Sequence, residues 1–496
     1  MTQSIKQISG LTELRHYFAH NKVPIYFISA TNFNLLGIDE WVKHFRFINY
    51  IDCFDGRHTN IITPIHQSSR VLDSIEDINH YLLENKDIQD QFEQDQNRAG
   101  MSKKPRALFL FFNQETERIC DSLGLECAFP AADLVHDIDN KITTTEIGNQ
   151  ANVPSVPNQL TRISSFSDLK TQCQNAKLGD SWVIQLPYGD SGKTTFFVEN
   201  EDDYNQYSDQ IESEETVKIM KRIQCKGTAI EACVTDSGTI VGPLMSELIG
   251  YPELTPYKGG WCGNALHQSD FSLAVRTEVQ QNVIRLGNEL QKRGYKGYFE
   301  VDFLIDTNTN DVYLGEINPR ITGISAMTNL AEFATAMVPP FLFHIMAFSD
   351  VPYTIDVDQY NEYVLHHGAT QTWGQLVFKY TTDDIQIVTD APASGVWALN
   401  DGHMDLVSPH THRRAAQQAN QAFFYRITKT DDYVYKGADL GILFIQDGLM
   451  TSSGNLTDTA NQWISALQKC YHYRALTTEE QLLVARYRNP GQLKVF

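Results

Sequence analysis

The sequence predicts an α/β (α+β) protein with three domains, on the basis of three observations. At 496 residues the chain is longer than one hydrophobic core usually covers. Its first part alternates short apolar runs with helical patterns, which is typical of a parallel sheet covered by helices. The pattern changes near residue 130 and again near residue 350. We therefore expect domains over residues 1–130, 131–350 and 351–496.

The first domain contains strand-sized apolar runs at Ile25–Ile28 and Ala107–Phe112. They are separated by helical patterns, so an α/β domain with a parallel sheet is predicted. The stretch Glu84–Lys104 is rich in Asp, Gln, Asn and Lys, and we expect a polar helix or loop at the surface. No residue pattern in this domain indicates a chemistry of its own.

The second domain is predicted to start with a helix followed by an extended segment, because Pro154 and Pro157 cannot continue a helix. A second helix is expected over Glu278–Arg293. Strand-like runs separated by turns lie between these helices. These runs are Trp182–Leu186, Thr195–Val198, Val217–Ile223 and Thr228–Val234.

The third domain consists of strand-like pieces separated by Gly, Asp and Asn. Helices are expected near Arg413–Phe424 and Ala460–Tyr471. This mixture predicts a small α+β domain, and its residues do not indicate a function.

The charge of the chain limits its partners. Against 40 Lys and Arg there are 61 Asp and Glu, a formal net charge of −21, so nucleic acid and anionic membranes are not expected as partners. The first 20 residues lack a signal-peptide core and no apolar run is long enough to span a bilayer, so we expect a cytoplasmic protein. The eight cysteines are widely spread without CxxC spacing, which favours packed, reduced thiols.

The most informative stretch is Tyr298–Arg320, in which two strand-like runs flank a polar turn, as in a β-hairpin. In the first run apolar and polar residues alternate, which places Glu300 and Asp302 on one face. If the turn spans Thr307–Asp311, Asp302 lies directly across from Glu316, with Cβ atoms roughly 4.5–5.5 Å apart.

Such a pair of acids predicts a bound cation, because like charges at this separation otherwise destabilise a sheet. Asn318 and Arg320 follow Glu316 at intervals of two, so the four side chains point the same way while the strand stays extended. Two carboxylates and an amide oxygen suit Mg2+, and Arg320 offers a positive fork for phosphate or carboxylate. The alternative is a solvated hairpin face with its charges in water.

The runs DFL at 302–304 and EINPR at 316–320 resemble the C-terminal signature of the ATP-grasp enzymes. In that family an acidic residue, a Glu and an Asn hold Mg2+ around the ATP phosphates. The resemblance implies that Asp302, Glu316 and Asn318 are metal ligands and that Arg320 stabilises an acyl phosphate and its transition state. It implies ATP and Mg2+ as cofactors, or Mn2+ in place of Mg2+.

The same resemblance assigns the three domains. It implies an N-terminal pre-ATP-grasp α/β domain, an ATP-grasp core with a glycine-rich lid at about 182–265, and a small C-terminal domain. The loop YGDSGKTT at 188–195 resembles that lid, although an ordinary hairpin turn is an alternative. Its glycines let backbone N–H groups turn toward an anion. The loop residues predicted to bind ATP are Gly189, Ser191, Gly192 and Lys193.

Other nucleotide contacts follow from the family pattern. The strand before the loop usually carries a Lys that contacts the phosphates, whereas this chain has Gln185 there, and Lys193 is a candidate to supply the missing charge. Lys141 corresponds to a second nucleotide-contacting Lys. Glu231 matches an acidic position, and His267 resembles a His near the nucleotide in biotin carboxylases. For Lys141 a solvent-facing lysine and for His267 a structural histidine are the alternatives.

The resemblance points to an ADP-forming carboxylate–amine ligase. Biotin carboxylases carry Gln-Val-Glu-His after the motif, with the Glu as base, whereas Ile321–Ile324 reads Ile-Thr-Gly-Ile. Small carboxylate and amine substrates are therefore expected, amino acids first among them, and the biotin-carboxylase layout suggests a homodimer. The alternatives are a biotin-carboxylase-like carboxylating enzyme and a degenerate nucleotide-binding module, which Gln185 favours.

Overall fold

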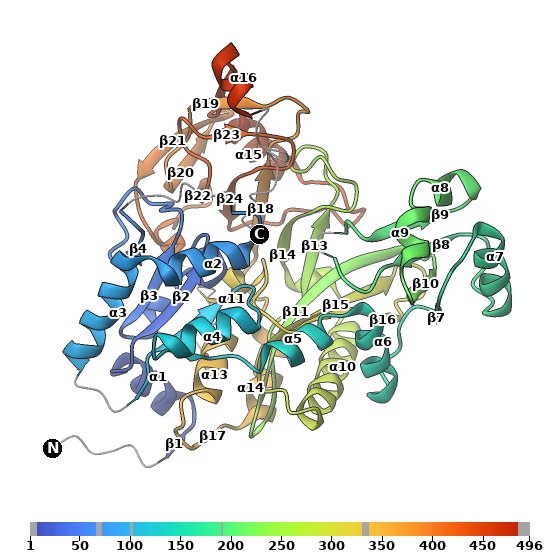
Figure 1. Cartoon of the computed structure of the whole chain (residues 1–496), viewed down its shortest axis with the longest axis horizontal. Coiled ribbons are helices and arrows are strands. Elements are labelled where there is room, and N and C mark those ends of the chain that lie inside the picture. Colours follow the sequence, from blue (N-terminus) through green and yellow to red (C-terminus); the bar gives the residue numbers. More distant parts are fainter. Residues whose placement is uncertain (1–6, 66–71, 100–102, 190–191, 330–336, 485–496) are drawn as a thin grey trace.

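The computed structural model describes residues 7–65, 72–99, 103–189, 192–329 and 337–484 (Figure 1). Three larger sheets organise these residues: a parallel N-terminal sheet, a small four-stranded antiparallel sheet and a large antiparallel sheet. The predicted α/β (α+β) class is confirmed. Among the described residues, no helix combines the length and apolar character that a membrane span requires.

The N-terminal sheet is parallel throughout, as predicted, with strand order β4-β3-β2-β5-β6. Its central strand β2 is fully buried, which suits a sheet covered on both faces. Within the predicted polar stretch Glu84–Lys104, residues Lys86–Ala99 form helix α3. The strands are β2 (Ile25–Ser29), β3 (Phe45–Asn49), β4 (Ile61–Ile62), β5 (Arg106–Phe109) and β6 (Glu126–Cys127), and the helices are α1 (Leu11–Ala19), α2 (Ile75–Glu84), α3 (Lys86–Ala99) and α4 (Gln114–Ser122).

The four-stranded sheet has the order β7-β10-β8-β9 and projects to one side of the molecule (Figure 1). The predicted lid range of about 182–265 does not coincide with it: this sheet already contains β7, and the strands after β10 belong to the large sheet. Its strands are β7 (Asn158–Thr161), β8 (Trp182–Gln185), β9 (Thr195–Val198) and β10 (Val217–Lys221), and the nearby helices are α5 (Ala132–Ile138), α6 (Lys141–Gln150), α7 (Phe166–Asn175), α8 (Glu201–Asn205) and α9 (Ser208–Ser213).

The large sheet has eleven strands within the described residues, in the order β16-β15-β11-β13-β14-β18-β24-β22-β20-β21, with β12 paired to β11. Strand β14 pairs with β18, so the large sheet contains strands from both sides of the predicted boundary near residue 350. Its strands are β11 (Cys225–Thr235), β12 (Gly238–Val241), β13 (Met245–Ile249), β14 (Trp261–Leu266), β15 (Gly297–Asp306), β16 (Val312–Asn318), β18 (Trp373–Lys379), β20 (Gly395–Asn400), β21 (His403–Ser408), β22 (Gln421–Arg426) and β24 (Asp439–Ile445).

Helix α10 (Leu273–Lys292) covers one face of this sheet. Ser272 caps its first turn by accepting the Val275 N–H, which satisfies one of the free backbone donors at a helix start. Its buried Val and Leu side chains recur every three or four residues, and each contributes about 1.5–3 kcal/mol to the hydrophobic core. The other helices around the sheet are α11 (Ser325–Asn329), α13 (Pro340–Ala347) and α14 (Val357–His367).

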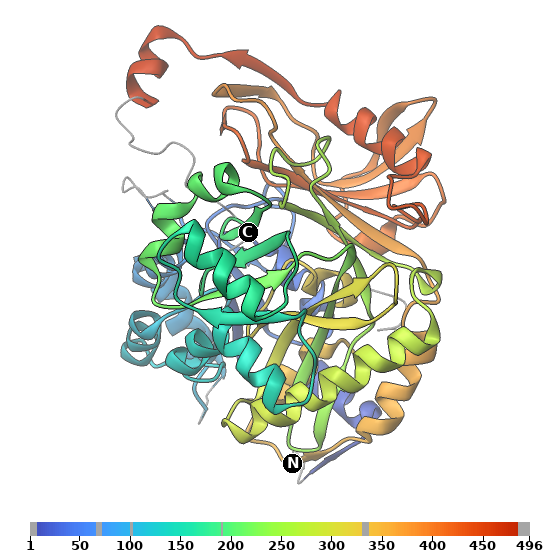
Figure 2. The same ribbon diagram turned by 90° about the vertical axis from the view of Figure 1, so that its right-hand side faces the viewer.

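The strands and helices from β18 onward lie at the opposite end of the molecule from α10 and α14 (Figure 1 and Figure 2). The prediction of a helix at Arg413–Phe424 is wrong: only Arg413–Ala415 forms a short 3-10 turn, and Gln421 onward is strand β22. All six residues of β22 are buried between neighbouring strands, and this packing outweighs the local helical pattern. The remaining elements are β1 (Ile8–Ser9), β17 (Tyr353–Thr354), β19 (Gln386–Asp390), β23 (Tyr433–Val434), β25 (His472–Ala475), α15 (Asp458–Gln468) and α16 (Thr478–Val484).

Candidate active site

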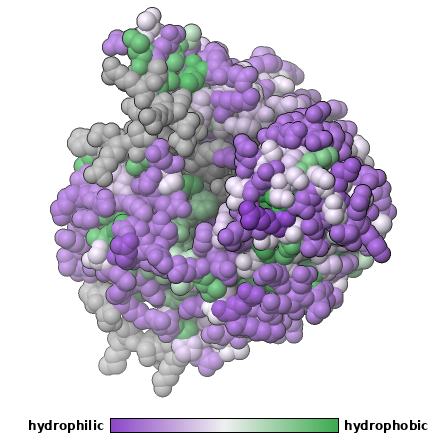
Figure 3. Space-filling model, turned by 45° about the vertical axis from the view of Figure 1, so that its right-hand side comes forward, coloured by the Kyte–Doolittle hydropathy of each residue, from purple (hydrophilic) through white to green (hydrophobic). Residues whose placement is uncertain are grey.

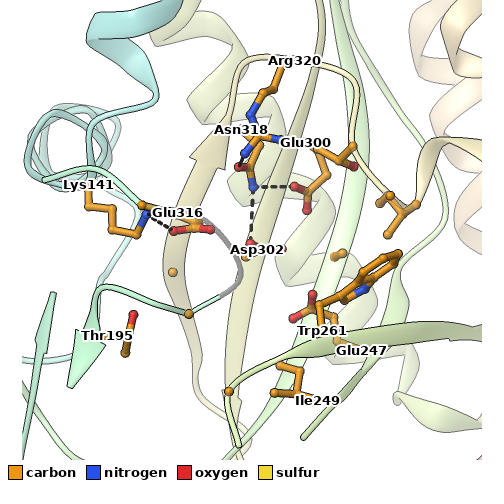
Figure 4. Close-up of a pocket in the computed structure, with 18 of the residues that line it drawn as sticks. Lys141, Thr195, Glu247, Ile249, Trp261, Glu300, Asp302, Glu316, Asn318 and Arg320 are labelled. Atoms are coloured by element: carbon orange, nitrogen blue, oxygen red, sulfur yellow. Dashed lines mark hydrogen bonds and ion pairs between the residues drawn. The ribbon is translucent and has the colours of Figure 1, made fainter. Parts of the chain in front are cut away.

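A cavity of about 290 Å³ lies where the three sheets meet. The N-terminal part, α6, the four-stranded sheet and the large sheet all contribute to its wall. Hydrophilic side chains predominate on the face shown in Figure 3, and hydrophobic ones appear in a hollow near its centre. The cavity contains most of the predicted site residues, as the close-up in Figure 4 shows.

The predicted hairpin is present, and Asp302 pairs directly with Glu316 as expected. The detailed register differs from a symmetric hairpin, because Phe303 pairs with Leu314 and Gly315 is the extra residue of a β-bulge. Near the turn the strands are therefore offset by one residue, and the bulge brings Asp302 and Glu316 opposite each other. The bulge is thus essential to the arrangement of the two acids.

Asn318 links the acidic side chains of the hairpin. Its Nδ2 donates to Glu300 Oε2 at 2.6 Å and to Asp302 Oδ2 at 3.3 Å, and its Oδ1 accepts from Arg320 at 2.9 Å. Arg320 also lies 3.5 Å from the Asp139 carboxylate and over the Phe111 ring. The structure therefore brings the four predicted hairpin residues together (Figure 4).

The acids of the cavity repel one another. Burial, followed by repulsion from Glu316, raises the pKa of Asp302 to about 7. Burial acts in the same direction on Glu316, but the Lys141 ammonium at 2.9 Å, together with Arg320 and a hydrogen bond with Asp302, outweighs it and lowers the pKa of that carboxyl. Burial and the neighbouring acids also raise the pKa values of Glu247 and Glu300. This accumulated negative charge favours a bound cation.

The donor set fits a magnesium nucleotide. Two opposed carboxylates are hard oxygen ligands, and Mg2+ completes its coordination with water and phosphate oxygens. The Asn318 Nδ2 faces Asp302 in this structure, so the amide must turn over for its oxygen to join the metal. Among the described residues, no group of three or more His, Cys, Asp or Glu side chains is arranged to hold a metal ion by itself. A metal at Asp302 and Glu316 would therefore take further ligands from the amide, water and nucleotide.

Lys141 begins helix α6 and is largely buried, so it is not the solvent-facing lysine of the alternative interpretation. Its Nζ contacts Glu316 and donates to the Gly189 carbonyl oxygen at 3.0 Å. One cation thus connects the metal-site acid to the glycine-rich loop.

The glycine-rich loop lies at the cavity in part. Gly189, Gly192 and Gln185 line its wall. Gly192 has a φ of +72°, and a Cβ there would lie 2.9 Å from the Gly259 carbonyl oxygen, so only glycine fits this close approach. Lys193 is exposed and is not part of the wall. Ser191 lies outside the described residues.

Lys218 is a buried cation that the sequence analysis did not identify. It lies opposite Gln185 on the neighbouring strand β10, and its Nζ donates to the Gly315 carbonyl oxygen at 3.3 Å. Burial lowers its pKa to about 8, while nearby Glu316 acts in the opposite direction. A cation thus lies across from the position where the family has its lysine. A lysine between the apolar residues Val217 and Ile219 was the available signal.

Two predicted nucleotide contacts are not at the cavity. Glu231 is fully buried, and its oxygens accept hydrogen bonds from Tyr298 Oη at 2.6 Å and Thr328 Oγ1 at 2.5 Å. Its hydrogen-bonding capacity is used inside the protein. His267 lies beside a separate, very small pocket and its Nδ1 is 2.7 Å from Ser269 Oγ. We correct both predictions on these grounds.

The cavity also contains residues that were not predicted as site residues. Glu247 and Trp261 come from β13 and β14, Asn34 comes from the N-terminal part, and Glu300 precedes Asp302 by two positions. Glu300 carried a sequence signal, because it shares the hairpin face with Asp302, and Trp261 lies in a stretch whose aromatic, Gly and Pro residues suit the cover of a small substrate. The others are separated from the motif by long stretches of chain.

No protein-family model matches the chain. Among the solved structures that align over most of the chain is the biotin carboxylase of Campylobacter jejuni in a β-γ-ATP complex. It has a TM-score of 0.59 and 14% identity, and the alignment covers 94% of this chain and 96% of that one. The carboxyaminoimidazole ribonucleotide synthase of Aspergillus clavatus complexed with ATP has a TM-score of 0.53 and 11% identity, with coverage of 90% and 99%. One curated relative, the [butirosin acyl-carrier protein]–L-glutamate ligase of Niallia circulans, is 26% identical over 149 residues.

These similarities define the class of fold. The chain has the ATP-grasp fold in the layout of biotin carboxylase, as the sequence motif predicted. Identities of 11–14% establish the fold alone. The match to the butirosin ligase covers 29% of this chain and 33% of that protein, and so spans about a third of its length.

Proposed function

We propose that this chain is an ATP- and Mg2+-dependent ligase that activates a carboxylate as an acyl phosphate and joins it to an amine. The observation that carries the proposal is the direct pairing of Asp302 with Glu316, with Asn318 and Arg320 on the same face of the cavity. Without a metal-dependent reaction there is little physical reason to gather these groups in one place.

In the proposed reaction an oxygen of the substrate carboxylate attacks the γ-phosphorus of ATP. The bond from that phosphorus to the β,γ-bridging oxygen breaks, ADP leaves, and an acyl phosphate forms. The nitrogen of an amine then attacks the acyl carbon, its carbon–oxygen bond to phosphate breaks, and an amide, inorganic phosphate and a proton are released. The equation balances without an oxidant or reductant.

The residues of the cavity have distinct parts in this scheme. Asp302, Glu316 and Asn318 would hold Mg2+, which neutralises charge on the phosphates when bound. Arg320, already oriented by Asn318 and Asp139, would stabilise the negative charge of the acyl phosphate. Lys141, and Lys218 behind it, would add positive potential beside the phosphates.

Carboxylation in the manner of biotin carboxylase is less well supported. The segment after Arg320 is Ile321–Ile324, and it contains no acid where the family pattern places the base. The similarity to an [acyl-carrier protein]–L-glutamate ligase favours the joining of a carboxylate to a second substrate over the carboxylation of biotin. We accordingly propose amino acids or other small amines as substrates, a cytoplasmic location, a homodimer, and Mn2+ as a substitute for Mg2+.

A screen of substrates tests this function. The full chain is incubated with Mg2+, ATP and pools of amino acids and polyamines, and ADP release and product mass are measured together. We expect ADP release with at least one pool and a product whose mass equals the two substrates minus water. The Glu316→Gln variant keeps the shape of the side chain and should lose activity at least a hundredfold, about 2.7 kcal/mol of transition-state stabilisation.

The matched control is Glu278→Gln, a change at an exposed residue of α10 that should leave the activity unaltered. Full turnover by Glu316→Gln would show that the metal assignment is wrong. No ADP release with any pool, despite nucleotide binding, would favour a binding module without ligase activity.

A further inference from the structure

Three side chains on the cavity wall have a buried polar atom without a hydrogen-bond partner in the part of the chain that the structure describes. These atoms are Glu300 Oε1, Asn34 Oδ1 and Thr322 Oγ1. The residues are only 2%, 2% and 8% exposed, respectively. Leaving a buried acceptor without a partner costs about 1–3 kcal/mol each. Such a group is expected to have a partner in the working state, and here the cavity is where that partner would lie.

The surrounding hydrogen bonds indicate what kind of partner is missing. The other carboxylate oxygen of Glu300 already accepts from Asn318 Nδ2 at 2.6 Å. The amide nitrogen of Asn34 donates to the Thr322 carbonyl oxygen at 2.8 Å, so its oxygen is the free acceptor. A carboxylate and an amide oxygen only accept hydrogen bonds, and a hydroxyl can do so. The missing partner is therefore a donor.

The charge of this wall indicates that the donor is a cation. Within the described part of the chain, Lys141 pairs with Glu316 and Arg320 with Asp139, while Glu247 and Glu300 are in no ion pair. Glu247 lies across the cavity from Asp302 and beside Trp261 (Figure 4). Both acids lie near Asp302, but the charge of a divalent metal there would be balanced by its own two carboxylate ligands, Asp302 and Glu316. Carboxylates in a buried setting favour a bound positive charge.

We infer that Glu300, with Asn34, Thr322 and Glu247, binds the ammonium group of the amine-bearing substrate. This inference rests on the proposed function and adds the recognition of one substrate class. An ammonium group has three N–H donors, which matches the number of unpartnered acceptors. The substrate class is a primary amine that is protonated in solution, such as an amino acid.

The apolar part of the wall limits the size of that substrate. Trp261, Ile249 and Ile324 line the cavity beside the acids. A Cβ on Gly323 would come within 2.4 Å of the Trp261 ring, so the chain passes directly against the indole and the wall is firmly packed there. The cavity of about 290 Å³ must also receive the γ-phosphate of the nucleotide, which leaves room for a compact organic group.

Binding measurements without turnover test this inference. Full-length protein is saturated with Mg2+ and the nonhydrolysable analogue AMP-PNP, and the thermal unfolding midpoint and binding heat are measured with L-amino acids, putrescine and spermidine. Their N-acetylated counterparts serve as probes that lack a primary ammonium group. We expect at least one free amine to bind and its fully acetylated counterpart to bind at least tenfold more weakly.

Variants connect this selectivity to the wall. Glu300→Gln replaces an acceptor by an amide and should weaken amine binding at least tenfold, while the Kd of Mg-AMP-PNP changes less than threefold. Asn34→Ala, which alters no charge, should weaken amine binding severalfold and serves if Glu300→Gln does not fold. Glu253→Gln, at an exposed residue, is the matched control and should bind the amine as the wild type does.

Each outcome decides between clear alternatives. If Mg-AMP-PNP binds and no free amine does, or if acetylated amines bind equally well, the ammonium site is wrong and the proposed ligase is untouched. If Glu300→Gln raises the Mg2+ requirement without changing amine affinity, Glu300 is a metal ligand and the inference fails. If Mg-AMP-PNP does not bind to the wild type, the proposed function fails first.

Discussion

Two buried glutamates lie opposite each other on neighbouring strands and have contrasting surroundings. Glu231 on β11 pairs in register with Glu300 on β15. Both oxygens of Glu231 accept hydrogen bonds from hydroxyl groups of Tyr298 and Thr328. Glu300 has one oxygen bonded to Asn318 and one without a partner at the cavity. Both glutamates are buried. What distinguishes Glu300, at the cavity, is an oxygen without a hydrogen-bond partner.

The two regions also differ in charge. Burial raises the pKa of Glu231 to about 8, which keeps it protonated and uncharged near neutral pH. No second acid contributes to that shift. Asp302 and Glu300, by contrast, are raised by burial and by neighbouring carboxylates as well. A bound cation can relieve repulsion only among the cavity acids Glu300 and Asp302. We therefore assign Glu231 a role in stability and the cavity acids a role in function.

Removal of the hydrogen bonds between Glu231 and the hydroxyls of Tyr298 and Thr328 should have the largest effect on stability. Glu231→Ala leaves the hydroxyls of Tyr298 and Thr328 without their acceptor inside the protein, and we expect the free energy of unfolding to fall by about 2 kcal/mol. Urea denaturation measures this change. The turnover of the remaining folded protein should be unaltered, because Glu231 does not line the cavity.

The exposed Glu278→Ala on α10 is the control and should change stability by less than about 0.5 kcal/mol. A Glu231→Ala protein that is as stable as the wild type but has lost nucleotide binding would reverse the comparison, since Glu231 would then belong to the functional region.

Local sequence pattern predicted the hairpin and the face that its acids share. The predicted register near the turn was off by one residue, and Asp302 pairs with Glu316 because the bulge offsets this difference. The parallel N-terminal sheet and helix α10 also followed from periodicity. The bulge at Gly315 could not be predicted, because the offset depends on how β16 pairs with β15 in three dimensions.

Contacts between distant segments were not readable from the sequence. Glu231 was predicted to contact nucleotide because its position in the family pattern was acidic, but the partners that enclose it come from residues 298 and 328. Lys218 was missed because its relation to Gln185 depends on the pairing of β10 with β8. The strand β22 was taken for a helix because burial on both faces is a tertiary property.

Lys218, on β10 of the four-stranded sheet, should affect nucleotide binding more than stability. Lys218→Met removes a positive charge beside Glu316 and Gly315, and we expect the affinity for Mg-AMP-PNP to fall about tenfold, or about 1.4 kcal/mol. The free energy of unfolding at pH 7 should not fall, because a buried charge is being replaced by an apolar chain of similar length. Calorimetric titration and urea denaturation provide the two measurements.

The matched control is Lys221→Met, an exposed lysine on the same strand, which should leave the affinity within twofold. Lys193→Met should also have little effect, because Lys193 is exposed and outside the cavity wall. Loss of affinity at Lys193 instead of Lys218 would show that the loop supplies the missing charge, as the sequence first suggested.

The smallest effect is the pH dependence of stability that Glu231 contributes by itself. The pKa of Glu231 is raised from 4.5 to about 8 by burial, so between these values the folded protein keeps a proton that the unfolded chain has lost. Its stabilising contribution is therefore complete below pH 4.5 and is lost as the pH rises through about 8, at up to about 1.4 kcal/mol per pH unit. Glu231→Gln removes the titrating group, and from pH 6 to pH 7 its stability relative to wild type should rise by about 1 kcal/mol in urea denaturation. A constant difference between the two proteins would mean that Glu231 is already ionised in the folded state, and the contrast between the two glutamates would then be one of hydrogen bonding alone.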